Sequence, residues 1–151
     1  MTGYPRDPHA QLAPHFRRFE LQCRCCAALQ LDPILLVVLE WLRAAGGDQP
    51  LQVNSGYRCP THNETVGGVP NSTHTRGLAA DLRHVDFAEL IHFGIQLPYI
   101  TGIIFHAAQD PAKRFLHLDV GNPVKRIFGY VDDAQTTLSG ALQAHQQMEG
   151  A

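Results

Sequence analysis

The stretch NSTHTRGLAADL, residues 71–82, places a histidine and an aspartate seven positions apart. His74 lies in a run of serine, asparagine and threonine that is typical of a loop, and Asp81 lies in a short apolar segment that we predict to be a strand. Gly77 allows the chain to turn between them, and two alanines before Asp81 leave space near the carboxylate. Because imidazole nitrogen and carboxylate oxygen both bind zinc, this stretch predicts a metal site where a loop meets a strand.

A catalytic zinc site takes three protein ligands and keeps one position open for water. The segment FLHLDV offers His117 as the third ligand, in a second predicted strand. On its own, a His–Asp pair at this spacing is more often structural, and a lone histidine in an apolar strand is more often a core residue. The metal site therefore needs support from further motifs.

The chain has 151 residues, of which 44% are hydrophobic and 17% charged, as expected for one globular domain. Its net charge of -2 argues against nucleic acid or an anionic membrane as a partner. No apolar run approaches the ~20 residues that span a bilayer, so no membrane segment is predicted. We expect a monomer.

Residues 31–47, LDPILLVVLEWLRAAGG, predict a helix. Asp32 is the expected N-cap, Pro33 occupies the first helical position, and Gly46 and Gly47 end the helix. Its apolar positions recur at helical spacing and predict a buried stripe. The stripe comprises Ile34, Leu35, Val38, Leu39 and Leu42.

The remaining periodic segments alternate between strand and helix patterns. A second helix is predicted over residues 86–97, with Asp86 as its N-cap. Strands are predicted within residues 50–58, 77–85, 100–108 and 114–121. Together these elements predict an α+β fold in which a small antiparallel sheet is flanked by helices.

Three ordered motifs resemble the zinc D-Ala-D-Ala carboxypeptidase family, which includes phage endolysin peptidases and shares its fold with the hedgehog signalling domain. The resemblance covers roughly residues 15–130, and the opening HFRRFELQCRCC is similar to the start of small phage-type and bacterial members. The matched positions are Ser55, Gly56, Tyr57 and Arg58, continued by Asn63 and VGG at 66–68; then Ser72, His74, Gly77, Ala79 and Asp81; and finally His117 and Asp119.

The resemblance implies a hedgehog/DD-peptidase fold and a Zn2+ ion held by His74, Asp81 and His117. The resemblance places a zinc peptidase domain over residues 16–131. Before it, prolines without periodicity predict an irregular arm over residues 1–15, and after it the polar residues 132–151 predict a tail that is either a loose helix or disordered. Arg58 resembles the arginine that holds substrate near the scissile bond, and a permanently charged guanidinium suits a peptide carboxylate or an oxyanion. Ser72 is either a substrate-binding hydroxyl or a loop cap.

The general base is where this sequence departs from the family. Many members carry a carboxylate three residues before the last zinc histidine, and that position is Arg114 here, which accepts no proton. Asp119 shares a strand face with His117, so it is either the replacement base or a residue that orients a ligand. His106 is a further catalytic candidate for acid–base or oxyanion chemistry, with a structural role as its alternative.

The four cysteines are Cys23, Cys25, Cys26 and Cys59. The run CRCC does not read as the CxxC spacing of a zinc ribbon. Reduced thiols, one disulfide to Cys59 and a second structural zinc all remain open, with reduced thiols as the default because no signal peptide is recognised. None is expected to bind the catalytic metal.

The predicted function is hydrolysis of the peptide stem of bacterial peptidoglycan, as a D-Ala-D-Ala carboxypeptidase or as an endopeptidase. The first alternative is a zinc-stabilised binding module of the same fold without catalysis, and the second is a metal-free structural domain. The start of the chain lacks the basic-then-apolar pattern of a signal peptide. We therefore expect synthesis in the cytoplasm and action on the cell wall, in keeping with a phage-type release.

Overall fold

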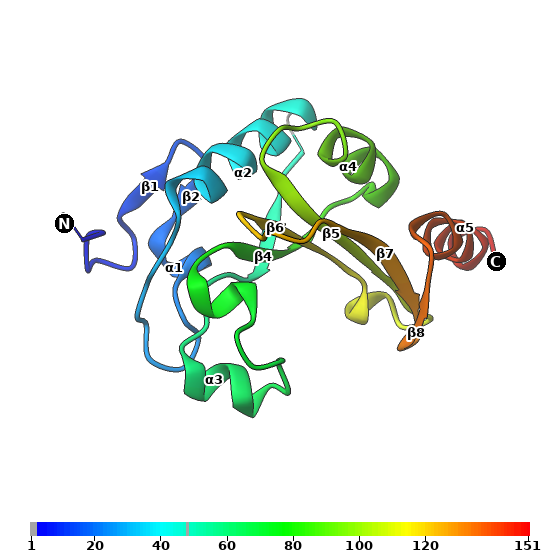
Figure 1. Cartoon of the computed structure of the whole chain (residues 1–151). Coiled ribbons are helices and arrows are strands. Elements are labelled where there is room, and N and C mark those ends of the chain that lie inside the picture. The colour runs from blue at the N-terminus through cyan, green and yellow to red at the C-terminus, as the bar shows by residue number, and fades with distance from the viewer. Residues whose placement is uncertain (1–2, 48) are drawn as a thin grey trace.

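The computed structural model describes residues 3–47 and 49–151 and has a six-stranded mixed sheet at its centre (Figure 1). The first two residues of the expected arm lie outside this description. The strand order is β3-β4-β6-β5-β7-β8, and β1 and β2 pair separately at the N-terminal end. The strands are β1 (Gln11–Ala13), β2 (Phe16–Arg17), β3 (Gln52–Ser55), β4 (Ala79–Arg83), β5 (Ile100–Ala107), β6 (Phe115–Val120), β7 (Arg126–Val131) and β8 (Ala134–Thr136).

Five α-helices and two short 3-10 helices accompany the strands in the described part of the chain. The α-helices are α1 (Arg18–Leu21), α2 (Pro33–Ala45), α3 (Pro60–Thr65), α4 (Phe87–Gly94) and α5 (Leu138–Glu149). The 3-10 helices are η1 (Thr73–Arg76) and η2 (Pro111–Lys113).

The predicted helix over residues 31–47 is confirmed as α2, with the expected ends. The Asp32 carboxylate accepts a hydrogen bond from the Ile34 N–H, Pro33 is the first helical residue, and Gly46 is the C-cap. The buried stripe differs at two positions, because Ile34 is only partly buried and Leu36 is buried instead. The buried residues of α2 are Leu35, Leu36, Val38, Leu39 and Leu42.

The two faces of the sheet have different environments, because side chains alternate along each strand. Ile103 and Phe105 of β5, and Leu116 and Leu118 of β6, are fully buried on one face. Helices α2, α4 and α5 cover this face and form the core with it (Figure 1). The alternate residues, including His106 and His117, point to the opposite face, which is therefore available for a functional site.

The predicted α+β fold, with a sheet flanked by helices, is confirmed. The four predicted strands correspond to β3, β4, β5 and β6, and all three pairs between them are antiparallel. The sheet extends beyond them, because β7 pairs with β5 in parallel and β8 continues antiparallel to β7. No helix in the described residues is both long and apolar enough to span a membrane.

The segment after residue 131, predicted as a loose helix or a disordered end, contains an ordered helix that packs on the sheet. Thr137 caps α5 by accepting a hydrogen bond from the Gly140 N–H. Ala141 is fully buried against Gly129 of β7, where an added Cβ would lie 2.4 Å from the Ala141 Cβ. The missing side chain at Gly129 therefore allows α5 to approach the strand closely.

Candidate active site

The loop that carries His74 is fixed by local hydrogen bonds and by one glycine. His74 lies in η1, and its N–H donates to the Ser72 Oγ over 3.3 Å. Gly77 ends η1 in the left-handed region with φ of 72°, and an added Cβ would lie 2.3 Å from the Gln30 carbonyl oxygen. The turn predicted at Gly77 thus requires glycine for both conformation and space, and it holds His74 buried.

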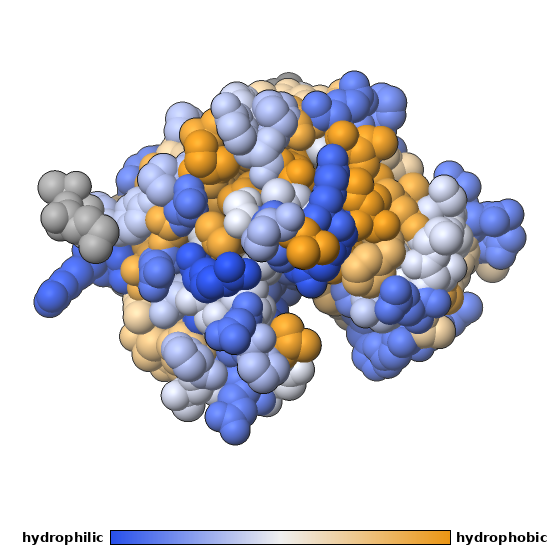
Figure 2. Space-filling model, in the orientation of Figure 1, coloured by the Kyte–Doolittle hydropathy of each residue, from blue (hydrophilic) through white to orange (hydrophobic). Residues whose placement is uncertain are grey.

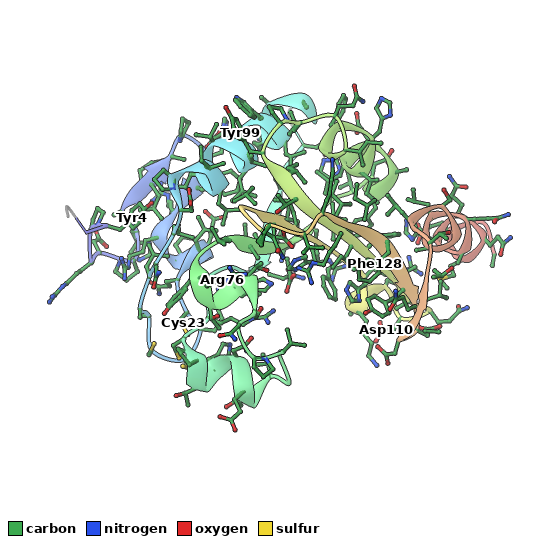
Figure 3. The ribbon with its side chains drawn as sticks, in the orientation of Figure 1. Tyr4, Cys23, Arg76, Tyr99, Asp110 and Phe128 are labelled. Atoms are coloured by element: carbon green, nitrogen blue, oxygen red, sulfur yellow. The ribbon has the colours of Figure 1, made fainter. Side chains whose placement is uncertain are left out.

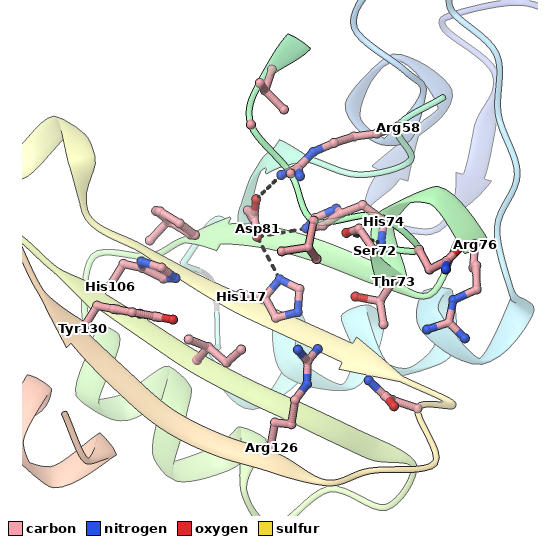
Figure 4. Close-up of a pocket in the computed structure, with 18 of the residues that line it drawn as sticks. Arg58, Ser72, Thr73, His74, Arg76, Asp81, His106, His117, Arg126 and Tyr130 are labelled. Atoms are coloured by element: carbon pink, nitrogen blue, oxygen red, sulfur yellow. Dashed lines mark hydrogen bonds and ion pairs between the residues drawn. The ribbon is translucent and has the colours of Figure 1, made fainter. Parts of the chain in front are cut away.

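The two strand residues of the predicted site lie directly opposite each other. Asp81 of β4 is the register partner of His117 of β6. The Asp81 Oδ1 lies 3.2 Å from the His74 Nε2 and 3.2 Å from the His117 Nδ1 (Figure 4). The structure therefore brings together the three predicted ligands, whose potential ligand atoms all lie within 4.8 Å of one another.

The far nitrogen of each imidazole already faces an acceptor. The His74 Nδ1 lies 2.8 Å from the Gly56 carbonyl oxygen, and the His117 Nε2 lies 2.8 Å from the Asp119 Oδ2. If each ring is neutral and donates its proton to that acceptor, its near nitrogen presents a bare lone pair to Asp81. Three acceptors that converge without a proton repel one another, and a cation between them removes the repulsion. The donor set therefore fits zinc.

The same contacts change the proton affinities of these groups. Burial opposes ionisation of Asp81, but hydrogen bonds to His117 and His74 outweigh it and hold the pKa of Asp81 well below its usual range. Burial also opposes protonation of His117, but Asp119 and Asp81 outweigh it and raise the pKa of His117. A metal ion must therefore displace a proton that His117 would otherwise tend to hold.

Arg58 lies beside the cluster and contacts one of its members. Its Nη2 donates to the Asp81 Oδ2 over 2.8 Å, and its Nε donates to the Ser55 Oγ over 2.9 Å. The Nη1 lies 3.5 Å from the Asn63 Oδ1. The guanidinium thus orients the Asp81 carboxylate, a role that sequence reasoning missed, while one edge still faces the pocket predicted to receive substrate.

The three clustered residues lie in a pocket of about 770 Å³. Figure 2 shows the molecule hollowed on this side, between the part that contains α3 and the part that contains β8. One wall is the loop from Val66 to Asn71 with η1, and the other is formed by β5, β6 and β7. The charged residues of its lining are Arg58, Arg76, Asp81, Arg126 and Asp133, and its ring-bearing residues are His74, His106, Phe115, His117, Phe128 and Tyr130.

Asp119 lies on the far side of His117 from the cluster and does not line the pocket. Its Oδ2 accepts from His117 and from the Arg126 Nη2 at 2.9 Å, and its Oδ1 accepts from the Thr101 Oγ1 at 2.7 Å. The side chain is fully buried, and these three partners together hold the pKa of Asp119 below its usual value despite burial. This geometry favours the orienting role over the role of general base.

His106 lies on the pocket face of β5 between two aromatic rings. Its ring stacks on Phe115 at a centroid distance of 4.1 Å and on Tyr130 at 4.7 Å. Burial between these rings lowers the pKa of His106, so its neutral form is favoured at neutral pH. His106 follows Ile104, which is the register partner of His117, by two residues on the same face. It is therefore a proton acceptor one diagonal step from the cluster.

Comparison with known proteins agrees with these motifs. The family model Peptidase M15 matches residues 14–119. The chain belongs to the M15 peptidase family. The zinc D-Ala-D-Ala carboxypeptidase of Streptomyces albus G is 52% identical over 44 residues, a stretch that covers 29% of this chain and 17% of that relative. This chain therefore leaves most of the relative's length uncovered. The family model confirms the predicted family, and neither comparison fixes this member's substrate.

Two further residues considered in the sequence, Arg114 and Ser72, make contacts that stabilise the fold of this M15 peptidase. Arg114 occupies the position where many members carry a carboxylate, and it is buried. Its Nε donates to the Ala108 carbonyl over 2.7 Å, and its Nη1 pairs with Glu149 of α5. It therefore fastens the β5–β6 connection to the last helix. Ser72 caps η1 and also lines the pocket, so both of its predicted roles stay open.

Arg126 was missed by sequence reasoning, although it lines the pocket (Figure 4) and donates to the buried Asp119. The one signal for this arrangement was Gly102 in the middle of an apolar strand. An added Cβ at Gly102 would lie 2.1 Å from the Asp119 Oδ2, so the glycine makes room for the buried carboxylate. Glycine within a strand often marks such a close approach.

Proposed function

We propose that this M15 family member is a zinc-dependent peptidase that hydrolyses the peptide stem of bacterial peptidoglycan. The observation that carries this proposal is the convergence of His74, Asp81 and His117 on one point inside a pocket. Both imidazoles have an acceptor at the far nitrogen, which leaves the near nitrogens free to bind metal. When bound, zinc polarises a carbonyl oxygen and lowers the pKa of bound water.

The positive charges of the pocket fit a substrate that carries carboxylates. Arg58, Arg76 and Arg126 line the pocket, against the carboxylates of Asp81 and Asp133. A planar guanidinium binds a carboxylate through two parallel hydrogen bonds. Stem peptides present carboxylates at the chain end and on acidic residues, so these arginines would select and orient the peptide next to the metal-binding residues.

His106 is our candidate for proton transfer. Its lowered pKa favours the neutral ring, which accepts a proton from the attacking water and returns it to the leaving amine. The stacking on Phe115 and Tyr130 holds the ring plane while leaving it in the pocket. Asp119 then acts as a positioning residue, which fixes the tautomer and orientation of His117 through its far nitrogen.

Two modes of cleavage fit this pocket. A carboxypeptidase would remove a terminal D-alanine, and an endopeptidase would cut within the stem or at a cross-link. A binding module without catalysis is the alternative, and the arginine at position 114 favours it because the usual carboxylate is missing there. The neutral histidine in the pocket favours catalysis, since it supplies an acceptor from another strand.

Mass spectrometry of purified peptidoglycan tests this proposal. After incubation with the full chain and zinc, we expect new stem fragments that disappear with a chelator and return when zinc is added again. Loss of one terminal alanine would identify a carboxypeptidase, and separation of cross-linked stems would identify an endopeptidase. His74→Ala is the matched control for metal-dependent cleavage. An unchanged muropeptide profile from zinc-loaded protein would leave the binding module as the better account.

A further inference from the structure

The four cysteines meet at the junction between the N-terminal segment and the loop that carries Arg58. Cys23, Cys25 and Cys26 follow α1, and Cys59 immediately precedes α3 (Figure 3, where Cys23 is labelled). The four Sγ atoms all lie within 4.8 Å of one another. This group shares no residue with the cluster of His74, Asp81 and His117.

The sulfur–sulfur distances fit a shared metal ion better than a disulfide. The Cys25 and Cys59 Sγ atoms are 3.4 Å apart, and those of Cys23 and Cys25 are 3.6 Å apart. A disulfide needs about 2.05 Å. Four sulfurs at about 2.3 Å from one tetrahedral zinc lie roughly 3.8 Å from each other. Moreover, a disulfide between Cys59 and one of the other three cysteines would leave two thiols unpaired.

The backbone arranges three of the sulfurs in one tight turn. The Cys23 N–H donates to the Ala28 carbonyl over 2.8 Å, and the Ala27 N–H donates to the Cys23 carbonyl over 2.9 Å. Ala27 adopts a positive φ of 60°, which a non-glycine residue rarely does without compensation. Cys23 and Cys26 also enclose two residues, so one CxxC spacing is present within CRCC. The expectation that CRCC lacks this spacing is therefore wrong for Cys23 and Cys26, between which Cys25 lies.

Backbone donors also point at the sulfurs. The Cys59 N–H donates to the Cys23 Sγ over 3.4 Å, and the His62 N–H donates to the Cys59 Sγ over 3.3 Å. Hydrogen bonds of this kind favour the thiolate, which is the form that binds metal. Such donors are the outer partners that metal-bound thiolates use to spread their charge.

We propose that Cys23, Cys25, Cys26 and Cys59 form a second metal site, a structural zinc tetrathiolate that fastens the N-terminal segment to the active-site loop. Four like donors close the coordination sphere and leave no position for substrate, as in structural zinc sites. The site joins residues 34 positions apart in the sequence, so it can form only in the folded chain, and the free energy of metal binding then adds to the stability of the fold.

The segment before these cysteines contacts the loop that orients His74. The Tyr57 N–H donates to the Leu21 carbonyl over 2.8 Å, two residues before Cys23. At Gly56, an added Cβ would lie 2.6 Å from the same Leu21 oxygen, so the two backbones are in close contact. The Gly56 carbonyl in turn accepts from His74. The thiolate site thus supports the loop that orients one ligand of the first site.

Metal analysis of the full chain, purified under reducing conditions with zinc, tests this site. We expect two zinc ions in the wild type and one each in Cys59→Ser and His74→Ala. Ala28 is an exposed residue of the same turn, so the control variant Ala28→Ser should retain both zinc ions. After cobalt substitution, thiolate-to-metal charge-transfer absorption should appear in the wild type and in His74→Ala but not in Cys59→Ser. This pattern does not depend on peptidase activity, so it stands or fails separately from the proposed function.

Alkylation of the wild type covers the case in which Cys59→Ser does not fold. We expect all four thiols to resist alkylation until a chelator is added, and zinc to be released together with their modification. One zinc ion with four rapidly alkylated thiols, one zinc ion with a Cys25–Cys59 disulfide, or iron in the thiolate site would each overturn the proposal.

Discussion

Two histidines on the same face of the sheet have opposite electrostatic environments. His117 lies between the carboxylates of Asp81 and Asp119, which raise its pKa despite burial. His106, on the adjacent strand, lies between two aromatic rings, and burial lowers its pKa. Carboxylates on both sides suit a ligand that gives its lone pair to a cation, whereas a neutral ring without a charged hydrogen-bond partner suits reversible proton transfer. Environment therefore separates the roles that we propose for two chemically identical side chains.

The largest effect is expected when His117 is changed, because it is one of three predicted ligands. His117→Gln replaces the imidazole with an amide, which is a poor zinc ligand. Zinc affinity should fall by more than the roughly 10–100-fold that loss of an outer partner causes, and turnover should fall to the level of chelated protein. Competition with a chromophoric chelator measures the affinity. Unchanged affinity would mean that His117 is not a ligand.

The same substitution at His106 should separate the two histidines. His106→Gln removes the proton acceptor but no ligand, so zinc content should be normal while kcat falls by about 10²–10⁴. His92→Gln, at an exposed position of α4, is the matched control and should have wild-type kcat. Loss of zinc from His106→Gln, or full activity in it, would contradict the division of roles.

A smaller effect is expected when the environment of His117 is changed and the ligand is kept. Asp119→Asn removes the charge at the far nitrogen, which weakens the orientation and basicity of the imidazole. We expect a loss of about 10–100-fold in zinc affinity or activity, with activity restored at saturating zinc. If zinc-saturated Asp119→Asn instead loses about 10³-fold in kcat, Asp119 is the base and His106 is not.

Motifs that resemble the family, together with local patterns, predicted that His74, Asp81 and His117 lie close together. The α2 caps, the turn at Gly77 and the strand periods around Asp81 and His117 each depend on a few neighbouring residues. The period of two along a strand also indicated that Asp119 shares a face with His117. It left open which ring nitrogen the carboxylate reaches, because that depends on Thr101 and Gly102 of the adjacent strand.

Features that depend on distant contacts were not predicted. The parallel pairing of β7 with β5 joins segments without a local turn signal, and α5 is a polar helix whose position depends on the contact of Ala141 with Gly129. The aromatic surroundings of His106 have the same origin, since Phe115 and Tyr130 come from the strands on either side. The convergence of the cysteines likewise requires the turn at Ala27 and the start of α3.

The smallest expected effect is the pH dependence of stability that His106 contributes. Its folded pKa lies below the usual value of about 6.5, so between these two values the unfolded chain binds more protons than the folded one. Its contribution to stability is therefore complete above about pH 6.5, declines as the pH falls toward the folded pKa, and is constant below it. Because the ring is only partly buried, the change should be small.

Urea unfolding of the wild type and of His106→Gln at a series of pH values measures this contribution, since most other titrating groups are shared by the two proteins. The free energy of unfolding of the wild type, minus that of the variant, should decrease as the pH is lowered through 6.5. An increase over that range would show that the folded state favours the imidazolium. His106 would then resemble His117 in environment, and the electrostatic reason for giving the two histidines different roles would be lost.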